Sequence, residues 1–193
     1  EGKTPRFELK SPESKVLPFD TTTEGASMHR LKLGGPGPLT LAIKVWIGDA
    51  RTMRINNIMT ETVEGFLDVH DNIRWLDGEK YFTWTSERDG WMHLYRVSRD
   101  GKEVKPITNG DFDVVNINCI DPDGGYVYYI ASPDNPTERY LYRSRLDGTG
   151  KAERVTPAGS PGHHSYQMSA DAKWAIHTYN NSTTPNRISL VYL

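Results

Sequence analysis

Several features that are common in proteins are scarce or missing in this chain of 193 residues. It has one cysteine, Cys119, so no disulfide can form within the chain, and its place in an apolar run predicts a buried side chain rather than a nucleophile. No cysteine and histidine cluster has zinc-ligand spacing, and no apolar run is long enough to span a membrane as a helix. The net charge of −2 excludes the basic balance of a nucleic-acid-binding protein. We therefore expect no metal, no cofactor, no nucleic acid and no membrane-spanning segment.

Strand patterns are what the chain does contain, and residues 81–97 are the best example. Residues 81–86 (YFTWTS) alternate aromatic or apolar side chains with hydroxyl side chains, residues 88–90 supply an Asp-Gly turn, and residues 91–97 return. Glycine accepts the positive φ that a tight hairpin turn demands. The pattern predicts a β-hairpin here, and no amphipathic helix is apparent elsewhere.

The hairpin pattern recurs at a fixed distance. An aspartate followed by Gly or Ala precedes an aromatic strand at Asp77, Asp123 and Asp171, which are 46 and 48 residues apart. A threonine closes each unit at Thr60, Thr108 and Thr156, at intervals of 48 residues, so independent markers give one period. Four short strands in a period of this length are typical of β-propeller blades. An ordinary β-sandwich is the alternative, but sandwiches do not repeat residue identities in register.

The predicted fold is therefore all-β, a partial β-propeller of about four units with four-stranded antiparallel blades. The units fall at about residues 39–64, 65–110, 111–159 and 160–193, of which the first and last are incomplete. Residues 1–38 are rich in Pro, Gly, Ser and Thr and predict an irregular arm or an incomplete blade. Large aromatic side chains should pack between neighbouring blades. The core candidates are Trp75, Trp91, Tyr128, Tyr129, Tyr142 and Trp174.

A family resemblance is carried by four runs of residues. They are the run from Thr83 to Tyr95, the preceding FLDVHDNIRW, and the later YVYYIAS and RYLYRSRLDG. From about Ile43 to Leu193 the chain resembles the N-terminal β-propeller of the dipeptidyl peptidase IV family of serine peptidases, of the bacterial type. The resemblance implies an α/β-hydrolase domain that follows in the same parent chain, with a Ser, Asp and His triad. Such enzymes release dipeptides from peptide N-termini and prefer proline or alanine at the penultimate position. The resemblance also implies a homodimer and a periplasmic or secreted location. It implies no cofactor.

Two features of the family are missing from these residues. There is no Gly-x-Ser-x-Gly, since residues 158–162 (AGSPG) have the wrong spacing and contain a proline. A nucleophile elbow needs its serine on a tight strand-to-helix turn beside the oxyanion hole. There is also no adjacent Glu-Glu pair, which the family uses to bind the substrate's amino group. We therefore expect this polypeptide by itself to hydrolyse nothing, and we predict no catalytic residue within it.

The resemblance also points to candidate site residues. A loop at the position of residues 64–71 faces the internal cavity in the family, so Phe66, Leu67 and Asp68 are predicted to line the substrate channel. Phe66 and Leu67 would pack against substrate side chains, and Asp68 would attract a cationic N-terminus. The alternative is that Phe66 and Leu67 belong to the core of a blade.

Three charged or histidine-containing pairs and turns invite functional interpretations. Adjacent strand residues point to opposite faces, so His70 and Asp71 are expected to make structural hydrogen bonds rather than part of a triad. The pair His163 and His164 is by itself a poor metal site. The turn at residues 87–89 is expected to be a solvated hairpin tip, with contact to a neighbouring domain or subunit as the alternative.

The sequence supports one leading function and two rivals. The leading hypothesis is a propeller that gates and orients peptide N-termini for a hydrolase domain absent from this chain. One rival is a non-catalytic interaction module, because a fold does not fix a function. The other is the propeller of a related oligopeptidase or acylaminoacyl peptidase. A Gly-x-Ser-x-Gly or a Glu-Glu pair outside these residues would distinguish them.

Overall fold

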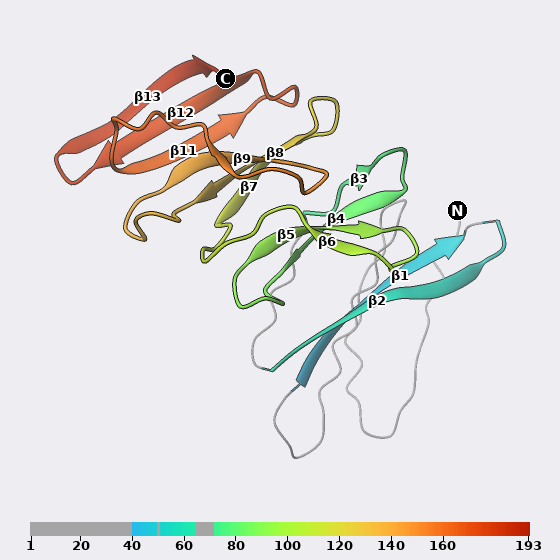
Figure 1. The fold of residues 1–193 in the computed structure, drawn as a ribbon. Coiled ribbons are helices and arrows are strands. Elements are labelled where there is room, and N and C mark those ends of the chain that lie inside the picture. Colours follow the sequence, from blue (N-terminus) through green and yellow to red (C-terminus); the bar gives the residue numbers. More distant parts are fainter. Residues whose placement is uncertain (1–39, 50, 65–71) are drawn as a thin grey trace, which may run out of the picture. The chain divides into compact units, whose positions relative to one another are not determined.

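The structure is a computed structural model, and it describes residues 40–49, 51–64 and 72–193. Thirteen strands and no helix form within these residues, so this part of the chain is all-β as predicted. The chain divides after Val69 into two compact units. The first unit contributes strands β1 and β2, and the second contributes β3 to β13 (Figure 1).

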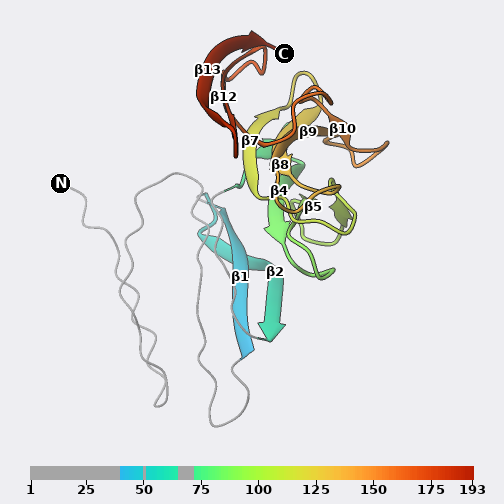
Figure 2. The ribbon, with the colours of Figure 1, turned by 90° about the vertical axis from the view of Figure 1, so that its left-hand side faces the viewer.

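The strands of the first unit form one long antiparallel hairpin. β1 (Thr40–Asp49) pairs with β2 (Arg54–Glu64) along its whole length, and the two make a twisted ribbon (Figure 2). The side chain of Asp49 accepts hydrogen bonds from the backbone N–H groups of Arg51 and Thr52 at 2.8 and 3.1 Å, which fixes the connection between the strands.

The second unit begins with the first four-stranded sheet, whose strands follow in chain order. They are β3 (Trp75–Leu76), β4 (Tyr81–Ser86), β5 (His93–Ser98) and β6 (Val104–Pro106). β4 has the bounds that the sequence predicts. The return strand begins two residues later than predicted, because Ser86 pairs with His93 and the intervening residues form the loop. Trp91 is therefore a loop residue and not a strand residue.

The second four-stranded sheet repeats this arrangement. Its strands are β7 (Asn116–Asp121), β8 (Tyr126–Ala131), β9 (Tyr140–Arg145) and β10 (Glu153–Arg154), again antiparallel and in chain order. A three-stranded sheet follows, with β11 (His163–Met168), β12 (Trp174–Asn181) and β13 (Thr184–Tyr192). The three sheets succeed one another through the second unit (Figure 1).

The repeat in the sequence corresponds to a repeat in burial. In both β4 and β8 the first residue is partly buried and the next five are buried. Successive strand residues point to opposite faces, so a continuous buried run means that both faces of these strands are covered. The aromatic and β-branched residues of these two strands recur because each four-stranded sheet places its second strand in the same environment.

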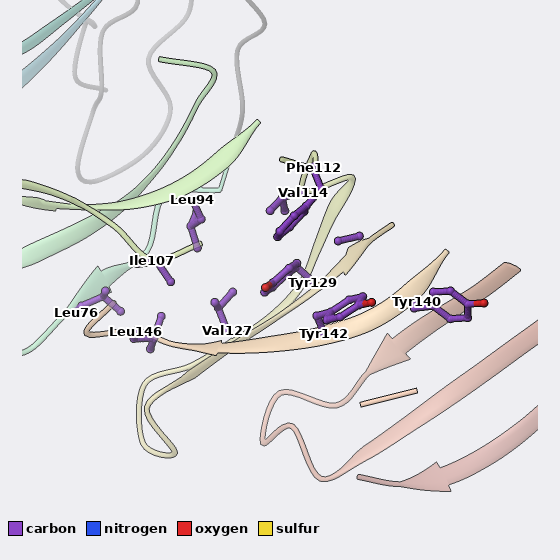
Figure 3. Close-up of a cluster of buried hydrophobic side chains, with 11 residues drawn as sticks. Leu76, Leu94, Ile107, Phe112, Val114, Val127, Tyr129, Tyr140, Tyr142 and Leu146 are labelled. Atoms are coloured by element: carbon purple, nitrogen blue, oxygen red, sulfur yellow. The ribbon is translucent and has the colours of Figure 1, made fainter. Parts of the chain in front are cut away.

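One hydrophobic cluster joins the two four-stranded sheets. Leu76, Leu94 and Ile107 of the first sheet and its following turn lie toward Val127 and Tyr129 of the second sheet (Figure 3). Tyr129 is fully buried, and its hydroxyl lies 2.9 Å from the hydroxyl of Ser144. Burial raises the pKa of Tyr129 above its usual value, so the phenol stays neutral.

A second cluster joins the second four-stranded sheet to the three-stranded sheet. Tyr128, Ile130 and Leu141 pack against Tyr166 and Ala175. Neighbouring residues of β8 therefore serve different interfaces, since Tyr128 and Ile130 face one way while Val127 and Tyr129 face the other. The second four-stranded sheet is the centre of the described core.

The prediction that six aromatic side chains form the core is right for the tyrosines and wrong for the tryptophans. Their exposed fractions are 7%, 0% and 5% for Tyr128, Tyr129 and Tyr142, and 39%, 39% and 47% for Trp75, Trp91 and Trp174. The tyrosines belong to the sheet that is covered on both faces. The tryptophans stand on an edge strand, in a loop, and on the face of β12 opposite to Ala175. Position among the sheets, and not ring size, decides their burial.

Candidate functional site

The substrate-channel candidates Phe66, Leu67 and Asp68 lie outside the described residues, and so do His70 and Asp71. Their roles therefore stay predictions. Among the described residues, a groove bordered by several polar side chains lies elsewhere, beside the first strands of the second four-stranded sheet and the three-stranded sheet.

A groove of about 370 Å³ lies beside β7 and β11. Asn116 and Asn118 of β7 line it together with Ser165 of β11 and Thr178 of β12, and Arg139 lies at the end of the loop that precedes β9. These side chains offer hydroxyl, amide and guanidinium groups, and no carboxylate is among the residues that line the groove in the described part of the chain. The groove is thus suited to a polar or negatively charged ligand.

Backbone hydrogen bonds between the sheets form the frame of this groove. The N–H of Arg139 donates to the carbonyl of Gly162 at 3.1 Å, and the N–H of His164 donates to the carbonyl of Arg139 at 2.9 Å. Gly162 has φ = 146°, and a Cβ at this position would lie 2.5 Å from the carbonyl oxygen of Asn180. Only glycine allows this close approach, which holds the start of β11 against the loop that carries Arg139.

The guanidinium of Arg139 is held by its own loop. Its Nη1 atom donates to the hydroxyl of Ser132 at 2.8 Å and to the carbonyls of Pro136 and Glu138 at 3.0 and 2.9 Å. All three acceptors are neutral, so the positive charge is oriented but not offset. Arg139 could not be singled out from the sequence, because residues 132–139 have the composition of an ordinary polar hairpin loop.

The two adjacent histidines point in different directions. His163 is exposed, and its Nε2 lies 2.9 Å from the carbonyl of Thr137. His164 is buried, and its Nε2 lies 2.8 Å from the carbonyl of Ser160. Alternation along β11 places the two rings on opposite faces, so they do not form a joint metal site, although both residues border the groove.

His164 instead pairs with His177 of the neighbouring strand. The rings stack with centroids 5.1 Å apart, and Nδ1 of His164 lies 2.9 Å from Nε2 of His177. A carbonyl can only accept, so the neutral His164 carries its proton on Nε2 and donates it to Ser160, which leaves Nδ1 to accept from the Nε2–H of His177. If both rings became charged, two N–H groups would face each other at this distance.

The histidine pair predicts a loss of stability in mild acid. Burial lowers the pKa of His164 and of His177 below the usual 6.5, and Arg154 and His163 lower that of His164 further, against Glu138 and the Ser160 carbonyl, which raise it. The unfolded chain then binds more protons than the folded one, so stability is fully present above about pH 6.5 and falls as the pH drops toward the lowered pKa values. Urea unfolding of the full-length protein between about pH 7.5 and pH 5 measures this.

The variant His177→Gln keeps an N–H donor for His164 but removes one titrating group, so its stability should depend less steeply on pH. His163→Gln is the matched control, because it removes an exposed neighbour whose charge lowers the pKa of His164 only as a minor cause and leaves the His164–His177 hydrogen bond in place, so the profile should stay nearly as steep. A His177→Gln profile as steep as that of the unchanged protein would contradict the prediction.

The charged turn at residues 87–89 is ordered by its own contacts. The N–H of Gly90 donates to the carbonyl of Glu87 at 2.9 Å, and the side chain of Asp89 accepts from the N–H of Trp91 at 3.3 Å. The guanidinium of Arg88 lies over the ring of Tyr95, 4.7 Å from its centroid. The tip is exposed, and a contact to another domain or subunit stays a prediction.

The described residues also bear on metal binding and membrane insertion. No group of three or more His, Cys, Asp or Glu side chains there is placed to hold a metal ion. Nor does any helix there have the length and apolar character needed to cross a bilayer. Cys119 is half-buried in β7, and burial raises the pKa of its thiol, which disfavours the nucleophilic thiolate.

Successive antiparallel sheets with a repeated burial pattern, packed face to face by two clusters, are the blades of a partial β-propeller. The family model for the dipeptidyl peptidase IV N-terminal region matches residues 40–186, which is about three quarters of the chain. The chain therefore belongs to the dipeptidyl peptidase IV N-terminal region family.

Curated relatives agree with this assignment. The chain is 31% identical over 146 residues to a probable dipeptidyl-aminopeptidase B of Emericella nidulans, covering 71% of this chain and 16% of that protein. It is 35% identical over 103 residues to a protein of the same name from Coccidioides posadasii, covering 52% and 11%. A probable dipeptidyl peptidase 4 of Aspergillus flavus is 32% identical over 109 residues, covering 56% and 14%. The chain thus spans less than a fifth of the length of these relatives.

A solved structure supports the fold. The crystal structure of Porphyromonas gingivalis dipeptidyl peptidase 4 superposes with a TM-score of 0.65 over 79% of this chain and 23% of that one. The sequence identity is 21%, so the likeness concerns the fold.

Proposed function

We propose that this chain is the propeller segment of a dipeptidyl-peptidase-like serine exopeptidase, and that it gates and orients peptide N-termini for a hydrolase domain of the same parent polypeptide. The observation that carries the proposal is the match of the family model to residues 40–186. The relatives named above are dipeptidyl peptidases by name and extend well beyond the matched part.

The absence of a Gly-x-Ser-x-Gly from the sequence assigns a supporting role to this segment. In the proposed parent enzyme the chemistry is acyl transfer to a serine, with a histidine as the base and water completing hydrolysis. The propeller supplies no group to that step. It positions the peptide, and Phe66, Leu67 and Asp68 are the residues proposed to line the path of the substrate.

The test uses the chromogenic amide of Ala-Pro, with the full-length protein and this chain assayed in parallel. We expect the full-length protein to hydrolyse the amide and this chain to be inactive. Asp68→Asn in the full-length protein should raise KM about tenfold, because a hydrogen bond to a charged group contributes about 1.5–3 kcal/mol.

Asp123→Asn is the matched control, since Asp123 is an exposed turn residue on the second four-stranded sheet and its carboxylate makes no contact there. If the full-length protein leaves both the Ala-Pro and the Gly-Pro amides intact, the proposed dipeptidyl peptidase function is ruled out. Cleavage of longer or blocked peptides alone would then indicate a related oligopeptidase or acylaminoacyl peptidase, and no cleavage a binding module. A KM that Asp68→Asn leaves unchanged removes the proposed role of Asp68.

A further inference from the structure

We propose that the groove beside β7 and β11 binds a carboxylate of a peptide and that Arg139 is the residue that recognises it. The idea rests on the proposed function for the peptide, and it names a chemical preference for that substrate which the fold alone does not supply. Three observations support it: the free edge of Arg139, the charge of the groove, and the hydroxyl groups opposite.

The first observation is the geometry of the Arg139 side chain. Its Nη1 atom is occupied by three neutral oxygens of its own loop. Its Nε and Nη2 atoms have no hydrogen-bond partner in the described part of the chain, and this edge presents two parallel N–H groups. That fork matches the two oxygens of a carboxylate and gives a bidentate, charge-assisted pair. The loop contacts hold the guanidinium in place before a ligand arrives, which reduces the entropy cost of binding.

The second observation is the charge. Arg96, Arg99, Arg143 and Arg145 each lie within 3.2 Å of a carboxylate oxygen. Arg139 has no such partner among the described residues, although it is partly buried. The carboxylate of Glu138, the residue immediately before Arg139, accepts a hydrogen bond from the hydroxyl of Tyr140 instead. An anion in the groove would therefore meet one uncompensated positive charge and no negative one.

The third observation is the position of the remaining polar groups. Ser165 pairs with Thr178 across β11 and β12, and both side chains line the groove. Neither hydroxyl has a hydrogen-bond partner in the described part of the chain, so both can donate to or accept from a peptide backbone. The volume of about 370 Å³ is in the range of small-ligand sites. β7 and β11 are the first strands of their sheets, and in a propeller blade that strand borders the central channel.

The experiment uses pairs of peptides that begin with Ala-Pro. The two members of a pair differ only in having Glu or Gln at one position, and the pairs place this residue at successive positions after the cleaved dipeptide. With the full-length protein we expect one position at which Glu raises kcat/KM about tenfold over Gln, as about 1.4 kcal/mol of charge-assisted binding would give. Arg139→Gln should reduce the Glu-to-Gln ratio to about one. A ratio that stays high in Arg139→Gln, or no position with a preference, overturns the proposal.

A second variant separates recognition from folding. Ser165→Glu places a carboxylate in the groove and leaves the loop contacts of Arg139 intact, and it should also abolish the preference. Arg145→Gln is the control, because it removes one exposed arginine that is paired with Asp147, and it should keep the preference. If Arg145→Gln also lost the preference for Glu, the preference would come from the overall charge of the protein, and the proposal would be overturned. Peptides with an amidated C-terminus distinguish a side-chain carboxylate from the chain terminus.

Failure of the proposed function would be recognised separately, because the protein would then cleave none of these peptides. In that case, fluorescence anisotropy with a labelled Glu peptide and its Gln counterpart tests the groove directly. A carboxylate site is supported if the Glu peptide binds about tenfold more tightly than the Gln peptide and if this difference disappears in Arg139→Gln. Equal binding of the two peptides overturns it.

Discussion

Leu141→Ala should lower the free energy of unfolding of the propeller by about 2–5 kcal/mol, the range for truncating a fully buried leucine. Leu141 has an exposed fraction of 0% and packs with Tyr128 and Tyr166 where the second four-stranded sheet meets the three-stranded sheet. The neighbouring strands are tied by backbone hydrogen bonds and cannot collapse into the space. Urea unfolding of the full-length protein, followed by tryptophan fluorescence, gives the change.

Leu141→Met is the control for this prediction. It keeps the side-chain volume approximately, so it should cost less than about 1.5 kcal/mol. Equal losses for the alanine and methionine variants would mean that shape at this position matters more than the cavity, and a loss below about 1 kcal/mol for Leu141→Ala would contradict the burial described above.

Thr156→Val should lower the free energy of unfolding by about 1–3 kcal/mol although it preserves the shape of the side chain, because it leaves buried polar groups unpaired. The hydroxyl of Thr156 accepts the N–H of Leu141 at 2.8 Å and lies 3.0 Å from the hydroxyl of Tyr166. Thr156 is 2% exposed, so water does not replace the lost partner. The same urea titration measures the effect.

The repeat supplies matched variants for this prediction. Thr108 occupies the equivalent position in the first four-stranded sheet, where it is 2% exposed and accepts the N–H of Leu94 at 3.0 Å, so Thr108→Val should cost a similar amount. Thr60 is exposed, and within the described residues its hydroxyl bonds only to the side chain of Asn57, so Thr60→Val should change stability by less than about 0.5 kcal/mol. A similar effect at all three positions would refute the argument.

The threonines also show why part of this fold could be read from the sequence. Thr108 and Thr156 recur because each receives the N–H of a leucine in the third strand of its sheet, a contact that must be made again in every four-stranded sheet. Thr60 shares the spacing without the environment, since it lies in the long β1–β2 hairpin. Spacing therefore identifies a repeated unit but not the role of every residue in it.

The candidate site was less predictable. Arg139 and Ser165 come from the second and third sheets of the second unit, and only the packing of those sheets brings them to one groove. His164 and His177 are 13 residues apart, and nothing in the sequence marks them as partners until the register of β11 and β12 is known. The predicted channel residues Phe66, Leu67 and Asp68 rest on family resemblance alone.

The sequence by itself determined the all-β class, the period, the bounds of β4 and the family, because alternation, Asp-Gly turns and residue identities are local features that each repeat displays. Only the tertiary structure decided which aromatic side chains are buried, how His164 is paired and where an uncompensated arginine stands. These depend on which faces of neighbouring sheets meet, and the free energy of those contacts comes from residues far apart in the chain.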